Sequence, residues 1–381
     1  KDASGHRFMP DYEPEKKELA SRDVVSRRME EHIRAGHGVK TRFGDHLWLD
    51  ITLLGAQHIN GKLREVKEIC QHFLGIDPVK DMIPVRPAQH YSMGGIRTDA
   101  AGRARGLAGL FACGEAACWD LHGFNRLGGN SVAETVVAGM IVGETMADFV
   151  ESSAGELQVS TALVREFLER EQAKIDTLLH GNGTENASEL MRRMQDIMTE
   201  KVGIFRRGDL LQEAVDELQA LLLRSRKIGI GTKRAGANPE LVTAYRLQKM
   251  LKLALCVAYG ALQRTESRGA HFREDHPRRD DAGWLKRTLA TWHDDFQTLP
   301  TLAYESLDVT RMELPPGWRG YGAKNAIEHP ATEARVAEVA TIRSAFGHAD
   351  RYTVQQALMP FDHLVPEAFR GRNARPGEET S

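Results

Sequence analysis

The chain has 381 residues, of which 41% are hydrophobic and 27% are charged, a composition typical of a folded protein with two or three domains. Its 51 basic and 53 acidic side chains give a formal net charge of −2, which argues against a general nucleic-acid-binding surface. Four cysteines without a Cys-x-x-Cys pair indicate reduced packing residues and no metal site. No stretch approaches the roughly 18 uninterrupted apolar residues of a membrane-spanning helix.

The first 85 residues mix one clear helix with short strands. Ser21 is placed to cap a helix that runs towards Gly36. The segment Leu47–Ile51 alternates between apolar and polar residues as a strand does. The apolar side of the predicted helix consists of Val24, Val25, Met29 and Ile33.

Residues 86–150 are marked by two glycine-rich segments, His90–Gly95 and His122–Ser131. Strands are predicted near Gly95–Thr98 and Leu110–Cys113. Dense glycine permits positive φ and close approach of the backbone to a ligand. We therefore expect a binding pocket where these segments meet.

A buried helix is predicted directly after the second glycine segment. Ser131, with Glu134 three residues later, forms the pattern of a capping box before an apolar run. The N–H groups and the positive dipole end of this helix would face the pocket and favour an anion there. Arg126 offers paired donors that match a carboxylate, although a structural salt bridge is the alternative.

Residues 151–275 are predicted to be helical, with periodic runs at Leu163–Leu179, Ala187–Leu223 and Leu241–Arg264. The pair Asn238-Pro239 is typical of a capped helix start. Three such helices would pack as a bundle. Beyond Pro300, we predict strands at Leu302–Val309 and Met312–Leu314, and a disordered tail at Arg370–Ser381.

The glycine segments carry a family resemblance. The chain reads His-Tyr-Ser-Met-Gly-Gly at 90–95, Gly-Glu at 114–115 and His-Gly-Phe-Asn-Arg-Leu-Gly-Gly-Asn-Ser at 122–131. Thr265–His271 and Arg279–Asp281 follow in the same order. These segments resemble the flavoprotein subunit of the succinate dehydrogenase and fumarate reductase family, above all bacterial menaquinol:fumarate reductases. The resemblance covers most of residues 1–325.

The resemblance implies a fold. It indicates the C-terminal part of an FAD-binding Rossmann-like domain with part of an α+β capping domain, then a three-helix bundle and a small C-terminal β/coil region. The expected boundaries are 1–85, 86–150, 151–275 and 276–381. No Gly-x-Gly-x-x-Gly follows a strand near residue 1, so we expect the C-terminal portion of a longer subunit. FAD would be attached to a histidine in the N-terminal portion.

The resemblance also assigns the site residues. It implies that Arg22 is the catalytic proton donor, although from the sequence alone Arg27 or Arg28 would be equally suitable. It implies that His90 and Arg126 bind the substrate and assigns no metal ligand. It gives only weak support for site roles of Arg268 and His271. The residues that the resemblance places at FAD are Glu115, Asn130, Ser131 and Val132.

The implied function is interconversion of fumarate and succinate by a quinol:fumarate reductase or succinate dehydrogenase. The implied partners are an iron–sulfur subunit and a cytochrome b membrane anchor, with no nucleic acid and no direct membrane span. The chain would lie on the cytoplasmic side of the bacterial inner membrane. Two alternatives stay open: a soluble L-aspartate oxidase-like flavoenzyme, and a fragment that is inactive without the N-terminal FAD fold. The physiological direction stays open as well.

Overall fold

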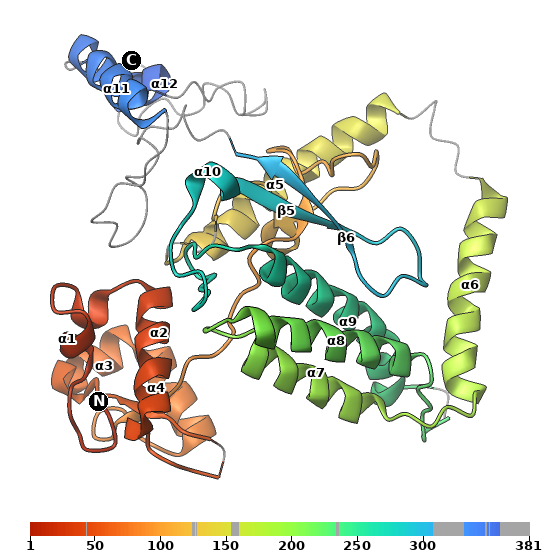
Figure 1. Ribbon diagram of the computed structural model, residues 1–381, viewed down its shortest axis with the longest axis horizontal. Coiled ribbons are helices and arrows are strands. Elements are labelled where there is room, and N and C mark those ends of the chain that lie inside the picture. Colours follow the sequence, from red (N-terminus) through yellow and green to blue (C-terminus); the bar gives the residue numbers. More distant parts are fainter. Residues whose placement is uncertain are drawn as a thin grey trace. The chain divides into compact units, whose positions relative to one another are not determined.

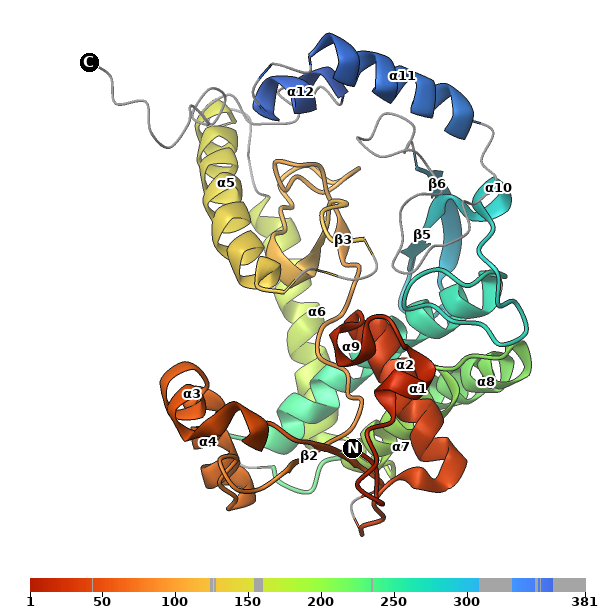
Figure 2. The same cartoon turned by 90° about the vertical axis from the view of Figure 1, so that its left-hand side faces the viewer.

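The structure is a computed structural model, and it describes residues 1–42, 44–123, 126, 128–153, 160–233, 236–307, 331–346, 349 and 351–358. The chain forms two compact units, Lys1–Tyr91 and Ser92–Ser381 (Figure 1 and Figure 2). Each helix in the described segments falls short of the length or the hydropathy that a membrane span requires. The finer division at residues 85, 150 and 275 stays a prediction.

Helix α2 of the first unit confirms the helix expected after Ser21. It spans Arg22–His32 and continues as a π-helical turn, Ile33–His37. Ser21 occupies the N-cap position, but its hydroxyl donates to the Asp23 carboxylate (2.5 Å) and caps no backbone N–H. The apolar side of the helix packs on the start of the chain and on a strand, through contacts of Val25, Met29 and Ile33 with Phe8, Met9 and Leu47.

The remainder of the first unit is built from short elements. Strands β1 (Leu47–Leu49) and β2 (Ile83–Val85) pair antiparallel, which confirms the first part of the predicted strand at 47–51. The other elements are α1 (Met9–Tyr12), α3 (Gly55–Lys62), α4 (Arg64–Ile69) with its π-helical continuation Cys70–Leu74, and the 3-10 turns Lys17–Leu19 and Thr52–Leu54.

The second unit begins with a small parallel pair. Strand β3 (Ile96–Arg97) pairs with β4 (Ala117–Cys118), so the predicted strand near residue 96 is confirmed. The predicted strand Leu110–Cys113 is wrong. The backbone of this segment turns back on the residues just before it, and the Ala112 N–H donates to the Gly102 carbonyl (2.9 Å). Because this hydrogen bond closes a local loop, the segment does not extend into a sheet.

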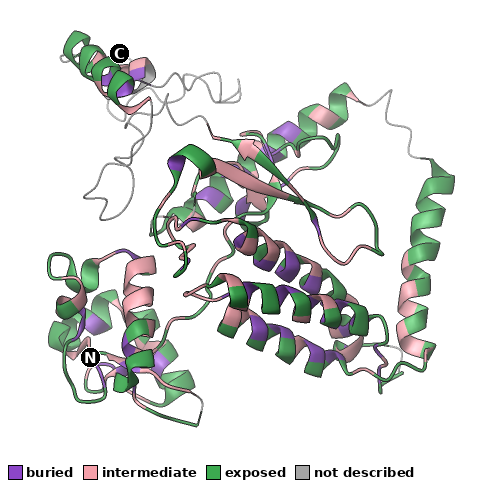
Figure 3. Cartoon of the chain, viewed as in Figure 1, coloured by how far each residue is buried: buried purple, intermediate pink, exposed green. Residues whose placement is uncertain are grey.

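Helix α5 (Asn130–Ser152) confirms the helix predicted after the second glycine segment, but not the expected burial. Most of its large apolar side chains are exposed, and green bands mark exposed residues along the helix in Figure 3. Among the described residues, Val142 is the one large apolar side chain at a buried position of α5, and the other buried positions are small or polar. The exposed residues are Val132, Val136, Val137 and Met140, and the buried ones are Glu134, Ala138, Val142 and Thr145.

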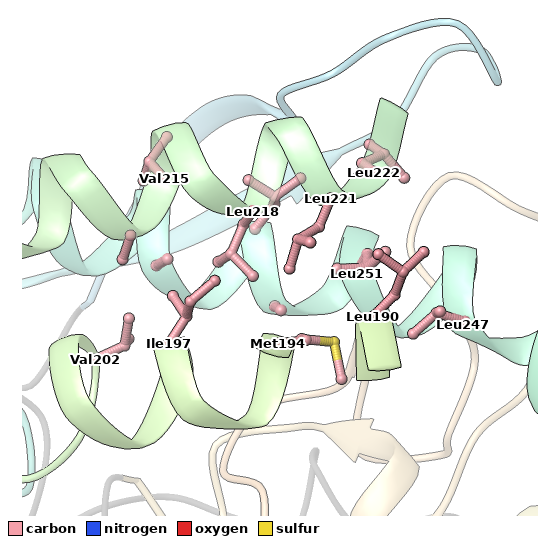
Figure 4. Packing of buried hydrophobic residues seen from close by; sticks show 14 of the residues in the cluster. Leu190, Met194, Ile197, Val202, Val215, Leu218, Leu221, Leu222, Leu247 and Leu251 are labelled. Atoms are coloured by element: carbon pink, nitrogen blue, oxygen red, sulfur yellow. The ribbon is translucent and has the colours of Figure 1, made fainter. Parts of the chain in front are cut away.

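Three helices form the bundle: α7 (Ala187–Lys201), α8 (Gly208–Ser225) and α9 (Pro239–Gln263). Their facing sides build one continuous apolar core (Figure 4). The Asn238 side chain accepts from the Leu241 N–H (3.1 Å), which confirms the predicted helix start. The largest fully buried members of the core are Leu190, Ile197, Leu211, Leu218, Leu247, Leu251 and Leu255.

The bundle differs from the prediction in which helices make it. The run expected at Ala187–Leu223 is two helices, because the chain turns sharply at Gly203. A Cβ at this position would lie 2.4 Å from the Thr199 carbonyl oxygen, so a larger residue would prevent the turn. The first predicted run is α6 (Thr161–His180), which has no buried residue and contacts α9 from outside, with Tyr245 donating to Glu171 (2.6 Å).

A two-stranded antiparallel hairpin follows the bundle. Strand β5 (Lys286–Thr291) pairs with β6 (Thr301–Ser306). Strand β6 confirms the first part of the strand predicted at 302–309, whereas β5 was not predicted. The predicted strand Met312–Leu314 and the tail Arg370–Ser381 lie outside the described residues. The remaining helices are α10 (Asp281–Trp284), α11 (Thr332–Ala345) and α12 (Arg351–Leu358).

Candidate functional site

The glycine turn at the start of the second unit lies against the turn that carries Glu115. The Ser92 N–H donates to Glu115 Oε1 (2.7 Å). Gly95 has a φ of 128°, and a Cβ there would lie 2.5 Å from the Ala116 carbonyl oxygen. Only glycine permits this approach. Glu115 itself is exposed in the 3-10 turn Gly114–Ala116, so the predicted flavin ligand lies beside the glycine turn and on the surface.

Helix α5 begins without a side-chain cap. Its N-cap residue is Gly129, with a φ of 81°, and the described residues provide no side-chain cap hydrogen bond. The predicted capping box of Ser131 and Glu134 is therefore wrong. Asn130 and Val132 are exposed and Ser131 is half-buried. The first N–H groups of a helix have no partner within the helix, so an uncapped start is suited to a bound anion or a polar ring edge.

Glu134 has a structural role that the sequence analysis missed. Its side chain is 6% exposed, and Oε1 accepts from the Gly114 N–H (3.2 Å) and from the Trp119 indole N–H (3.2 Å). The carboxylate thereby ties α5 to both sides of the turn that carries Glu115. An acidic residue within an otherwise apolar helix face was the signal, but it was assigned to a capping box.

The described residues between 122 and 134 offer polar groups that a bound flavin could engage. Three of its side chains have a buried polar atom without a partner among the described residues: His122 Nε2, Ser131 Oγ and Glu134 Oε2. Buried polar groups normally have a partner, and a polar ligand supplies one. The uncapped N–H groups of α5 would in addition meet an electron-rich ring edge.

The predicted substrate ligand Arg126 is half-buried. Its neighbours Phe124, Asn125 and Leu127 lie outside the described residues. Its assignment to a substrate carboxylate therefore stays a prediction based on the motif.

The predicted proton donor and second substrate ligand belong to the first unit. Arg22 is the first residue of α2, and its side chain is exposed. His90 is exposed near the end of the unit. Both side chains are therefore accessible to a substrate in the unit taken by itself, and their roles stay predictions.

The two alternative proton donors differ from each other in the structure. Burial lowers the pKa of Arg27. Burial also opposes ionisation of Arg28, but hydrogen bonds to Glu31 and Glu13 outweigh it and raise the pKa of this guanidinium. Arg28 is therefore the less suitable acid of the pair.

The arginine-rich loop after α9 is an internal ion-pair network. Glu266 is fully buried and accepts from Arg264 (2.6 Å) and Arg268 (2.8 Å), and Arg268 also donates to Asp281 (2.7 Å). Arg273 donates to the Ala261 carbonyl at the end of α9 (3.0 Å). These contacts give the loop a structural role. That role explains its charged residues more simply than a direct role in the site would.

His271 belongs to the same loop and is held in a neutral form. The guanidinium of Arg206 donates to His271 Nδ1 (2.7 Å), and Nε2 lies 3.3 Å from the Arg264 carbonyl oxygen. Burial, assisted by the charge of Arg206, lowers the pKa of His271 to about 4. Burial likewise lowers the pKa of Arg206 to about 10.

A second ion-pair cluster joins β5–β6 to β3–β4. Glu305 pairs with Arg97 (3.0 Å), Arg287 (2.9 Å) and Arg105. Arg97 also pairs with Asp120 (3.2 Å). The hydrogen bond from Arg97 and the neighbouring guanidinium charges lower the pKa of Glu305. The hairpin is thereby anchored to the strands that flank the glycine turn and Glu115.

Two family models match the chain. The model described as FAD binding domain matches residues 1–132, and the model described as fumarate reductase flavoprotein C-term matches residues 191–321. These two regions contain all of the predicted site residues and nearly all of the bundle, of which only the first residues of α7 lie outside.

Individual relatives of the chain are also flavoprotein subunits of fumarate reductases and succinate dehydrogenases. The fumarate reductase flavoprotein subunit of Helicobacter pylori is 49% identical over the whole chain, which covers 57% of that protein. The succinate dehydrogenase flavoprotein subunit of Rickettsia bellii is 34% identical, with 84% of this chain and 55% of that protein covered.

Among solved structures, the FrdA chain of E. coli quinol fumarate reductase superposes with a TM-score of 0.76 at 33% identity. The match covers 86% of this chain and 56% of that chain. The chain thus spans little more than half the length of the relatives it matches.

Proposed function

Because the chain belongs to the flavoprotein-subunit family of fumarate reductases and succinate dehydrogenases, we propose that it contributes the substrate-binding part of a site that interconverts fumarate and succinate. The cofactor is FAD, in agreement with the FAD binding domain match. The observation that supports the proposal most directly is the uncapped start of α5 beside the glycine turn and Glu115.

Each predicted residue has a defined task in this proposal. FAD, when bound, supplies the hydride chemistry. Arg126 holds one substrate carboxylate through paired N–H donors, and His90 binds the other. Arg22 delivers the proton, and a guanidinium, which is a weak acid, is competent only towards a carbon that becomes strongly basic during reduction.

The flavin would lie against the start of α5. The backbone N–H groups of Asn130, Ser131 and Val132 would stabilise negative charge on the ring. Glu115 would bind the sugar chain of the cofactor. Glu134 would act as a positioning residue, since it fixes the turn that carries Glu115 relative to the helix.

We further propose that the protein works in a membrane-associated assembly. An iron–sulfur subunit would deliver electrons from a cytochrome b anchor that oxidises quinol. The chain itself would lie on the cytoplasmic side of the bacterial inner membrane. Two solved relatives support this assignment, since both are quinol fumarate reductases. The matches include fumarate reductases and succinate dehydrogenases alike, so the proposal covers both directions.

The test uses the flavoprotein that contains this chain, purified in its native assembly and assayed with reduced viologen and fumarate. Arg22→Ala and Arg126→Ala should abolish turnover while FAD stays bound. His90→Ala should mainly raise KM. Arg192→Ala is the matched control, because this arginine is exposed on α7 and has no site role.

Three outcomes would contradict parts of the proposal. Near-normal turnover of Arg22→Ala would exclude this residue as the proton donor. An unchanged KM for His90→Ala would exclude its substrate contact. Oxidation of L-aspartate in place of succinate by the unmodified protein would identify the soluble flavoenzyme alternative.

The exposed apolar face of α5 favours a second candidate, in which the chain alone binds partners but no flavin. The isolated 381-residue chain should then fail to quench added FAD fluorescence. Quenching at one FAD per chain would exclude this second candidate.

A further inference from the structure

Three potential metal ligands meet in the first unit, at a place that has no role in the proposed reaction. They are Asp2, His32 at the end of α2, and His37 at the end of the π-helical turn. One ligand atom from each lies within 4.8 Å of the other two. The side chains of Asp2 and His32 are buried, with 7% and 8% exposed, whereas His37 is exposed.

The spacing of the two buried groups differs from that of a strong ion pair. Asp2 Oδ2 lies 3.3 Å from His32 Nε2. Charge-assisted N–H···O hydrogen bonds are shorter, typically about 2.7–2.9 Å. Two ligands bonded to one tetrahedral zinc at about 2.0–2.1 Å lie about 3.3 Å apart. The observed distance therefore equals the separation of two ligands of one metal ion.

The Asp2 carboxylate is oriented for this role by its other oxygen. Oδ1 accepts from the Ser4 N–H (2.9 Å), the Ser4 hydroxyl (2.7 Å) and the His6 N–H (2.9 Å). Oδ2 is thereby directed to the histidines. Ligating carboxylates in metalloproteins are commonly held by such outer hydrogen bonds.

His32 is oriented in the same way. Its Nδ1 lies 3.1 Å from the Tyr12 hydroxyl, and the Phe8 ring stacks on the imidazole with centroids 4.4 Å apart. When Nδ1–H donates to Tyr12, the lone pair of Nε2 faces Asp2. A ligating histidine usually donates its second ring N–H in this manner.

His37 is brought to the cluster by the backbone. Gly36, with a φ of 89°, interrupts the helical conformation within the π-helical turn, and the His37 carbonyl accepts from the Ala3 N–H (3.0 Å). The rings of His32 and His37 lie with centroids 4.6 Å apart. The third ligand is thus placed beside the other two, and its exposure leaves room for water.

We propose that Asp2, His32 and His37 bind one divalent transition-metal ion of the Zn²⁺ class, with water as the fourth ligand. Two imidazoles and one carboxylate suit such an ion, whereas Mg²⁺ and Ca²⁺ prefer oxygen ligands throughout. The bound ion joins the start of the chain to the end of α2. It therefore stabilises the folded unit by mass action.

The test uses the full 381-residue chain without an affinity tag, stripped of metal and titrated with Zn²⁺ against a chromophoric chelator. Co²⁺ serves as the spectroscopic probe, because visible d–d bands report its coordination. We expect one Zn²⁺ per chain and an increase of Tm on binding. His37→Ala, which removes an exposed ligand, should weaken binding by about tenfold or more and abolish the Tm increase.

A matched control and a second variant make the outcome decisive. His72→Ala removes another exposed histidine of the same unit, in the π-helical turn Cys70–Leu74, and should bind as the unmodified chain does. Asp2→Asn keeps the shape of the ligand but should also weaken binding. Unchanged affinity in His37→Ala, or no Zn²⁺ binding by the unmodified chain, would overturn the proposal. The assay needs neither flavin nor substrate, so its result is independent of the proposed function.

Discussion

Helices α5 and α9 are similar in length and both are rich in apolar residues, yet their surroundings differ. In α9 one apolar face packs against α7 and α8, where Leu247, Leu251 and Leu255 are fully buried, although Leu253 on another face is exposed. In α5 most of the large apolar side chains are exposed, and the buried face holds Glu134 and Val142 besides smaller residues. Hydrophobic periodicity indicates that a face seeks burial, but not which polypeptide covers it.

The largest expected effect on stability distinguishes a buried residue of α9 from an exposed residue of α5. Leu251→Ala in α9 should lower the free energy of unfolding by about 3 kcal/mol, because it leaves a cavity in a closed core. Met140→Ala in α5 removes a similar volume from a side chain that is 59% exposed. It should change stability by less than about 0.5 kcal/mol. Urea unfolding followed by circular dichroism measures both, and equal losses would contradict the comparison.

A second expected effect is a pH dependence of stability that arises in the arginine-rich loop after α9. The folded pKa of His271, about 4, lies below the ordinary value of 6.5. Between these pH values the unfolded chain binds a proton at this side chain and the folded chain does not. Stability present above pH 6.5 is therefore lost as the pH falls towards 4, by up to about 3 kcal/mol.

The measurement is urea unfolding at pH values above and within this window. His271→Gln should show a smaller loss on acidification than the unmodified chain. His58→Gln, which changes an exposed histidine, should lose as much stability as the unmodified chain. An identical loss in both variants would assign the pH dependence to other groups.

The smallest effect distinguishes the two helix starts. Asn238 caps α9 with its side chain, so Asn238→Ala should cost about 1 kcal/mol. Asn130 at the start of α5 makes no cap bond, and Asn130→Ala should leave stability nearly unchanged. Thermal unfolding of the two variants tests this pair, and a larger loss for Asn130→Ala would show that α5 depends on its first turn.

Local signals in the sequence predicted several elements correctly. The pair Asn238-Pro239 marked the start of α9, and the apolar side with Val25, Met29 and Ile33 marked α2. In both cases the sequence signal is local, because it lies within the residues of a single helix.

The errors concern contacts that depend on distant residues. Glu134 was assigned to a capping box, but its partners are Gly114 and Trp119 in the preceding loop. Strand β5 was not predicted, and its anchor, Asp120, is remote in sequence. The roles of Arg22, His90 and Arg126 came from the family resemblance, since charge and spacing alone do not distinguish Arg22 from Arg27 or Arg28.

The ion pair between Arg97 and Glu305 has a consequence for the order of folding. It joins residues 208 positions apart, and α5 to α9 all lie within the loop that it closes. The contacts between α7 and α8 close far smaller loops. Since the entropic cost of closure must be met before a distant contact forms, the bundle should assemble first and the hairpin should dock onto β3–β4 late.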